Sequence, residues 1–226
     1  MGFEPYTTEQ LVSYYRQNIN SLEGFDISNI YLVEDLQVIA DKYGIKESTT
    51  NMEGFAVPIN GGVVAILNNL NGFNSIKALF HELTHISDNI WFAKEYGVVE
   101  VAKHPYYYVL QIYSEINAFK IGNQYAVEFL SDGNPMLKYN MYESISLDSI
   151  LRDLLCKKEI ELYDIAKALG YILLYDDFYK IDDHLSHIPD SVSLQLRGVI
   201  QSILDAYYND DIEEMDYIIN LVTVKR

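Results

Sequence analysis

Apolar residues recur at helical spacing over much of the chain, and near its start they predict two amphipathic helices. Residues 7–19 open with threonines and acidic or amide residues, which suit the first turn of a helix. Within 33–43, Leu36, Ile39 and Ala40 share one helical face, and a glycine follows as a stop signal. We therefore expect a helix in each segment.

A different pattern follows, because residues 54–58 and 62–67 are short segments rich in β-branched and small apolar residues. The intervening Ile59-Asn60-Gly61-Gly62 contains Asn-Gly, a strong hairpin signal. These segments predict two antiparallel strands joined by a tight turn.

Helical spacing returns over 75–90, with Asn74 as the expected N-cap, and over 106–130, where Pro105 suits the first turn. The cluster Ser131-Asp132-Gly133-Asn134-Pro135 is typical of a loop and is the best boundary candidate. Beyond it the pattern predicts helices over 147–156, 160–175, 191–208 and 212–222.

This order predicts an α+β fold that is mostly helical, with a small antiparallel sheet beside the helix over 75–90. We expect one compact domain over 1–139 and a helical extension over 140–226 packed on it.

The charge balance narrows the class of partner. The 226 residues carry a formal net charge of −17, which disfavours nucleic acid and anionic membrane surfaces as partners. Cys156 is the single cysteine, so an internal disulfide framework is excluded, and we expect it to be a small buried residue on a helix. With neither a secretory signal pattern nor a long apolar segment in view, the sequence favours a cytoplasmic protein.

The helix over 75–90 contains His81-Glu82-Leu83-Thr84-His85, an H-E-x-x-H motif. At about 100° per residue, His81 and His85 point the same way and can bind one Zn²⁺ through ring nitrogens. The opposite side carries the apolar residues Ile76, Leu79, Leu83 and Ile86. Glu82 can reach a metal-bound water, take its proton as the water attacks a carbonyl, and pass that proton to the leaving amine.

A catalytic zinc needs a third protein ligand, and two carboxylates qualify. Glu115 lies in an apolar stripe of the next predicted helix, where a carboxylate is costly unless a cation compensates it. Ala118 and Gly122 are small, so this helix can approach another closely. Asp88 shares the face of the histidines; it is the other candidate, but it fits better as a residue that orients a histidine ring.

These parts together resemble the minimal gluzincins, compact zinc peptidases of the ImmA/IrrE-like type that phages and mobile elements often carry. The matching segments are Val63–Asn68, Ile76–Asp88 and Glu115–Ala118, and 36–45 looks like the first helix of that group. The resemblance covers roughly 33–130.

The resemblance implies that His81, His85 and Glu115 bind zinc and that Glu82 is the general base and acid. It also implies that the strand over 62–67 is an edge strand that pairs with an extended peptide or protein substrate, as an exposed strand edge can. Two positions depart from the group: Thr84 replaces a usual glycine, and Phe119 replaces a usual asparagine.

A tetrahedral intermediate also needs a hydrogen-bond donor for its oxyanion. We expect Tyr108 to be this donor, because it lies seven residues before Glu115 on the same helical face. His104 and the neighbouring tyrosines are further candidates. His184 and His187 lie in an acidic segment that could form a second weak metal site, although a solvated loop fits better.

Three functions stay open at this point. The first is a zinc metallopeptidase. The second is a catalytically silent zincin-fold module that acts by recognising a partner through its helical tail. The third is a metal hydrolase of a non-peptide bond, which the acidic charge makes unsuited to polyanionic substrates.

Overall fold

The structure, a computed structural model, describes residues 6–18, 22–46, 48–50, 52–59, 61–67, 70–181 and 183–223. The contacts divide the chain into two compact units, residues 1–99 with 121–139 and residues 100–120 with 140–226. Three short 3₁₀ turns, η1–η3, occupy Ile27–Asn29, Val101–Lys103 and His184–His187. The helices and strands are α1 (Thr8–Asn18), β1 (Ile30–Val33), α2 (Gln37–Lys42), β2 (Gly54–Val57), β3 (Val63–Leu67), α3 (Phe73–Glu95), α4 (Tyr107–Ser131), α5 (Pro135–Ser144), α6 (Leu147–Leu155), α7 (Leu162–Tyr179), α8 (Leu194–Tyr208) and α9 (Ile212–Thr223).

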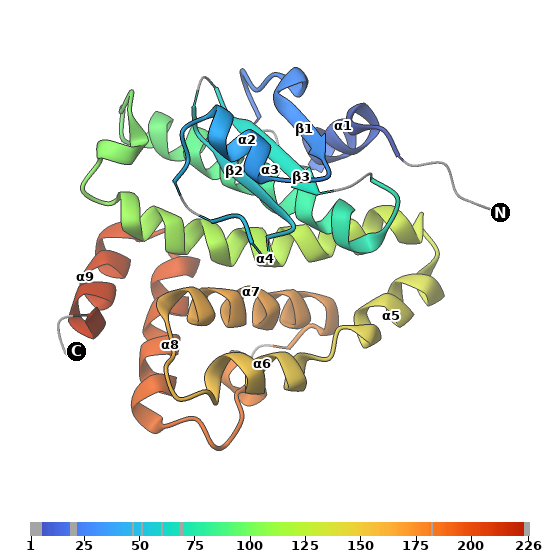
Figure 1. Cartoon of the computed structure of the whole chain (residues 1–226). Coiled ribbons are helices and arrows are strands. Elements are labelled where there is room, and N and C mark those ends of the chain that lie inside the picture. The colour runs from blue at the N-terminus through green and yellow to red at the C-terminus, as the bar shows by residue number, and fades with distance from the viewer. Residues whose placement is uncertain are drawn as a thin grey trace. The chain divides into compact units, whose positions relative to one another are not determined.

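The first unit is built on a three-stranded mixed sheet in the order β1-β3-β2. β3 pairs in parallel with β1 and antiparallel with β2, with Gly54 opposite Ile66 and Val57 opposite Val63. Figure 1 shows α3 running across the sheet, where it contacts β2 and β3. The sheet is thus the platform against which the H-E-x-x-H helix packs.

β3 is buried on both faces, which explains why it is apolar at every position. Val64 and Ile66 join the main hydrophobic core with residues of α1 and α3. Val63 and Ala65 point the other way, into a smaller cluster that includes Ile39 of α2. The alternation follows from the two-residue period of a strand.

A buried hydrogen bond ties α1 to α3. The hydroxyl of Tyr15, which is fully buried, donates to Thr84 Oγ1 over 3.1 Å. Thr84 in turn donates to the carbonyl oxygen of Phe80 over 2.8 Å. The threonine that replaces the glycine usual in the resembling group therefore has a structural role at this junction.

The second unit packs the first half of α4 with the later helices. α7 comes very close to α4 at Gly170, where an added Cβ would lie 2.6 Å from Phe119 Cβ and 2.8 Å from Ile116 O. From α8, the hydroxyl of Tyr207 donates to Asn117 Oδ1. Asp210, just beyond α8, accepts a hydrogen bond from Tyr113 over 2.7 Å. The first half of α4 is therefore a central element of this unit.

The α+β, mostly helical fold class is confirmed, and β2 and β3 form the expected antiparallel pair. One correction is the strand β1, which was not expected and pairs in parallel with β3. It includes Val33, the first residue of the helix expected over 33–43, and that helix begins only at Gln37. The N-cap of α3 is Gly72 rather than Asn74. Cys156 is exposed at the end of α6, not buried. Three residues named in the predictions lie outside the described residues: Ile19, Asn68 and Asn60, the last of which belongs to the expected turn.

No helix in the described ranges is both long and apolar enough to cross a membrane.

Candidate zinc site

α3 presents two histidines on one side and a packed apolar face on the other. His81 and His85 are half-buried and lie one turn apart, whereas Ile76, Leu79, Leu83 and Ile86 are in the core. The helix runs from Phe73 to Glu95, so the motif sits near its middle. Core packing on one side therefore fixes the direction of both imidazoles.

The two rings face each other through the same ring nitrogen. His81 Nε2 and His85 Nε2 are 3.1 Å apart, and the ring planes are nearly perpendicular, at 85°. Two nitrogens bound to one tetrahedral zinc at 2.0–2.1 Å would be about 3.3 Å apart. The pair thus fits a zinc ion with a shift of a few tenths of an ångström.

Burial also keeps His85 in the form that binds metal. Desolvation lowers the pKa of His85 to about 4, so its ring is neutral at pH 7. A neutral imidazole is the form that coordinates zinc, because its nitrogen keeps a lone pair.

A carboxylate from α4 completes a three-residue group. One ligand atom from each of His81, His85 and Glu115 lies within 4.8 Å of the other two. Burial raises the pKa of Glu115 to about 7, and the nearby Lys167 partly offsets that rise. A half-buried carboxylate beside two imidazole nitrogens is a donor set that suits zinc, and metal binding would compensate the charge.

Gly122 allows α4 to lie against the histidine helix. A Cβ at this position would be 3.1 Å from both His81 Cβ and Lys77 O, and 3.2 Å from His81 N. The expectation that a small residue here permits a close helix approach is confirmed. Since Gly122 follows Glu115 by two helical turns, the same face of α4 carries both residues.

Glu82 points from α3 toward the sheet. Its side chain is only 7% exposed, and a Cβ on Gly54 of β2 would lie 3.2 Å from Glu82 Cγ. Glycine at the first position of β2 therefore leaves the space that the Glu82 side chain occupies.

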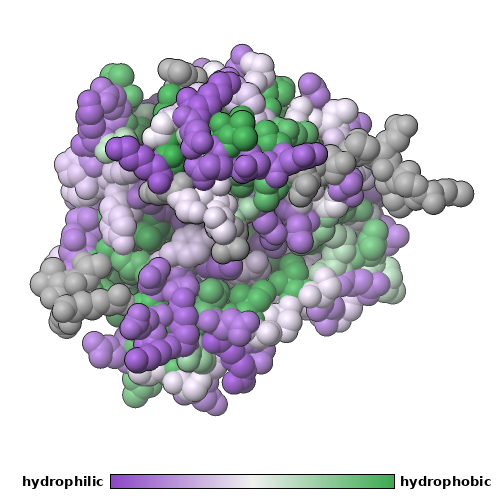
Figure 2. Space-filling model, in the orientation of Figure 1, coloured by the Kyte–Doolittle hydropathy of each residue, from purple (hydrophilic) through white to green (hydrophobic). Residues whose placement is uncertain are grey.

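The strand beside Glu82 corrects one expectation. The strand over 62–67 is not an edge strand, because β3 lies between β1 and β2. The edge next to Glu82 belongs to β2, whose outer side has no strand partner among the described residues. In the region where Figure 1 draws α2 and β2, Figure 2 shows hydrophobic residues among hydrophilic ones. Val38 of α2 and Met52, two residues before β2, are exposed hydrophobic side chains.

The remaining predicted residues lie at different depths. Asp88 is buried on α3, one turn beyond His85, and is not part of the three-residue group in the described chain. Tyr108 is 51% exposed on α4 and lines a pocket together with Glu115. His104 Nδ1 accepts a hydrogen bond from the backbone of Tyr106 over 3.2 Å. The roles proposed for Asp88 and Tyr108 stay predictions.

No family model, curated protein or solved structure matches this chain.

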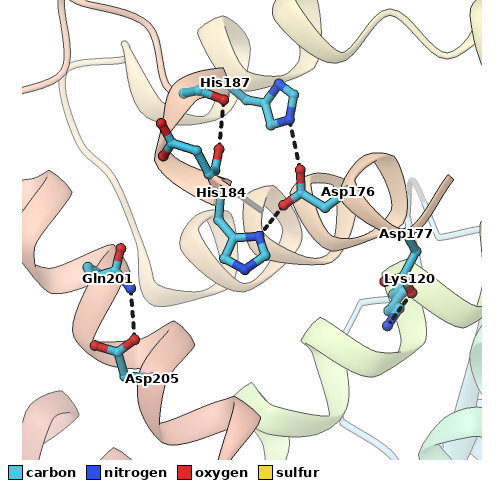
Figure 3. Close-up of polar contacts among 9 residues, drawn as sticks. Lys120, Asp176, Asp177, His184, His187, Gln201 and Asp205 are labelled. Atoms are coloured by element: carbon cyan, nitrogen blue, oxygen red, sulfur yellow. Dashed lines mark hydrogen bonds and ion pairs between the residues drawn. The ribbon is translucent and has the colours of Figure 1, made fainter. Parts of the chain in front are cut away.

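A second polar cluster lies in the second unit, and its described residues do not form a metal group of this kind. Figure 3 shows His184 and His187 both directed at the carboxylate of Asp176 on α7. His187 Nε2 is 2.9 Å from Asp176 Oδ1, and His184 Nδ1 contacts Asp176 Oδ2. The Asp176 side chain is 3% exposed, so the expected solvated loop is instead attached to a buried acid. Asp182, in the same acidic segment, lies outside the described residues.

Asp176 is hard to single out from sequence because its partners lie on a separate turn, η3. The sequence signal for Asp176 is a carboxylate within an apolar helical pattern that continues past residue 175. The same kind of signal marks Glu115.

Proposed function

We propose that this chain is a zinc-dependent metallopeptidase in which His81, His85 and Glu115 hold the metal and Glu82 transfers protons. The observation that carries the proposal is the group of three ligand atoms within 4.8 Å of one another. It joins the two histidines of an H-E-x-x-H helix to a half-buried carboxylate, the donor set of a gluzincin.

A zinc ion held there would supply a Lewis acid that polarises the scissile carbonyl and lowers the pKa of a water toward about 7. Glu82 directly follows a proposed ligand, and its Cγ lies near Gly54 of β2, which supports a role beside a substrate bound at that strand. In the proposed reaction Glu82 accepts a proton from the attacking water and then donates it to the leaving amine.

The outer edge of β2 is the proposed binding place for an extended peptide. Its backbone groups can pair with a substrate strand, and Glu82 lies next to its first residue, Gly54. Tyr108 is the proposed donor to the oxyanion, supported by its place beside Glu115 on α4.

A cytoplasmic location is also part of the proposal. It is supported by the one cysteine, Cys156, which is exposed and has no cysteine to pair with, as suits a reducing compartment.

The decisive experiment combines zinc content with peptide cleavage in matched variants. We expect one zinc per chain in the wild type and in Glu82→Gln, with cleavage of a peptide mixture by the wild type but not by Glu82→Gln. Glu95→Gln, the same change at an exposed position of α3, should leave both unchanged. Glu115→Gln should lose zinc, whereas Glu128→Gln on the same helix should keep it.

Two results would count against the proposal. A wild type that binds no zinc after incubation with the metal would leave a partner-recognition module as the better explanation. Zinc binding with equal cleavage by Glu82→Gln would exclude the proton transfer assigned to Glu82.

A further inference from the structure

A pocket of about 440 Å³ opens in the second unit beside Glu115. It is lined by Tyr108, Gln111, Ile112 and Glu115 of α4, by residues 161–163 at the start of α7, and by Val222 of α9. Its volume lies in the range of about 300–1,000 Å³ typical of small-molecule sites, so one large side chain fits inside.

The lining is mainly aliphatic and aromatic. Ile112, Leu162 and Val222 supply aliphatic wall, and two tyrosines add aromatic surface. No Lys, Arg or His lines the pocket in the described part of the chain. Such a lining favours an uncharged apolar occupant and gives an anionic one no counter-charge.

The two carboxylates in the lining are already engaged. Glu161 belongs to a capping box at the start of α7, in which its side chain accepts from the backbone of the third helical residue. Glu115 is the proposed zinc ligand, so its charge would be offset by the metal. Neither carboxylate is therefore positioned as a dedicated partner for a cationic side chain.

Glu115 links this pocket to the proposed reaction, because it lines the pocket and also belongs to the three-residue metal group. We infer that the pocket takes the substrate side chain next to the scissile bond, and that this side chain is aromatic or large and aliphatic. The inference rests on the proposed peptidase function. It makes α7 and α9 determinants of substrate specificity.

Leu162 offers a direct test, since it is the first residue of α7 and lies in the wall. Leu162→Trp should fill the pocket and Leu162→Ala should enlarge it. The matched control is Leu194→Trp, at the first residue of α8, where the side chain is 87% exposed and lies outside the pocket lining.

The first readout is the set of bonds cleaved in a synthetic peptide mixture that carries every residue type at each position. In the wild type we expect aromatic and large aliphatic residues at one position flanking the cleaved bond, favoured at least tenfold over Asp and Glu. Leu162→Trp should reverse this preference toward Gly, Ala and Ser, with one zinc retained. Leu162→Ala should keep the preference for large residues, and Leu194→Trp should match the wild type.

The second readout does not need turnover. N-acetylphenylalaninamide should bind zinc-loaded Glu82→Gln protein in ligand-observed NMR, and it should not bind the Glu82→Gln/Leu162→Trp double variant. N-acetylaspartamide should bind neither protein.

The outcomes separate the two proposals. Cleavage with the same preference in Leu162→Trp, or equal binding of the phenylalanine amide to both proteins, overturns the pocket assignment and leaves the peptidase intact. Absence of cleavage by the zinc-loaded wild type overturns the peptidase and with it the assignment of a substrate side chain.

Discussion

Gly122 of α4 lies directly against His81 of α3, so closely that an added Cβ would be 3.1 Å from the Cβ of the histidine. Two of the three nearest atoms, Lys77 O and His81 N, belong to the backbone of α3. Backbone atoms within a helix cannot move singly, so a methyl group here must shift the helices apart by a few tenths of an ångström.

Gly122→Ala should therefore weaken zinc binding about tenfold, since ligand distances in metal sites tolerate deviations of only about 0.2 Å. Competition with a chromophoric chelator would measure this. Gly198→Ala on α8 is the control, because nothing lies within 4 Å of its Cβ position. That variant should gain up to about 1 kcal/mol of stability from helix propensity and keep its zinc affinity. Unchanged affinity in Gly122→Ala would contradict the tight approach.

The metal-free protein should lose stability as pH rises because of Glu115. Burial raises the pKa of Glu115 to about 7 from 4.5. Between pH 4.5 and pH 7 the folded state holds a proton that the unfolded chain releases. The contribution of Glu115 to the free energy of unfolding therefore becomes unfavourable by about 3 kcal/mol above pH 7. In chelator, Glu115→Gln should match the wild type below pH 4.5 and exceed it by that amount at pH 8.

Urea unfolding at the two pH values would measure this difference. Burial lowers the pKa of His85 to about 4, so its contribution to stability is lost as pH falls from 6.5. This effect is the same in both proteins and cancels when they are compared. With zinc present the order should reverse, because only the wild type binds the metal fully. The same difference at both pH values would rule out a buried carboxyl.

Asp176 and Asp177 are neighbours with very different expected effects on stability. The buried Asp176 side chain contacts both His184 and His187, whereas Asp177 is 51% exposed and pairs with Lys120 over 2.7 Å (Figure 3). Asp176→Ala should cost about 3 kcal/mol, because it removes two charge-assisted contacts. Asp177→Ala should cost less than about 1 kcal/mol, as solvent screens its ion pair. Equal losses in chemical unfolding would contradict the buried role.

The junction between α1 and α3 can be tested with a single oxygen atom. Tyr15→Phe removes the donor to Thr84 while keeping the fully buried ring. The expected cost is about 1 kcal/mol of unfolding free energy. Tyr217→Phe, at a side chain that is 59% exposed, should have no measurable effect. A Tyr15→Phe variant as stable as the wild type would show that this hydrogen bond adds no net stability.

The sequence predicted features that depend on local periodicity. The two faces of the H-E-x-x-H helix follow from residues three and four apart, and the β2–β3 pair follows from β-branched segments around an Asn-Gly turn. Glu115 stands out because a carboxylate within an apolar stripe is costly to desolvate, and the local sequence alone shows that stripe. These signals need no knowledge of distant contacts.

Features set by long-range contacts are not visible in the local sequence pattern. β1 has four residues, too few to show a period, and its pairing with β3 lies more than thirty positions along the chain. The resemblance implies that β3 is an edge strand, but β1 and β2 flank it, so the free edge beside Glu82 is that of β2. Asp176 acquires its meaning only from two histidines on another turn.

The packing of α4 also bears on the order in which the protein matures. The half of α4 that carries Glu115 packs with segments far later in the chain, such as Tyr207 with Asn117 and Asp210 with Tyr113. A ribosome delivers these partners about ninety residues after α4. The residues that tether Glu115's helix are thus synthesised well after that helix, so a growing chain would carry the histidine motif long before it could hold the third ligand in place.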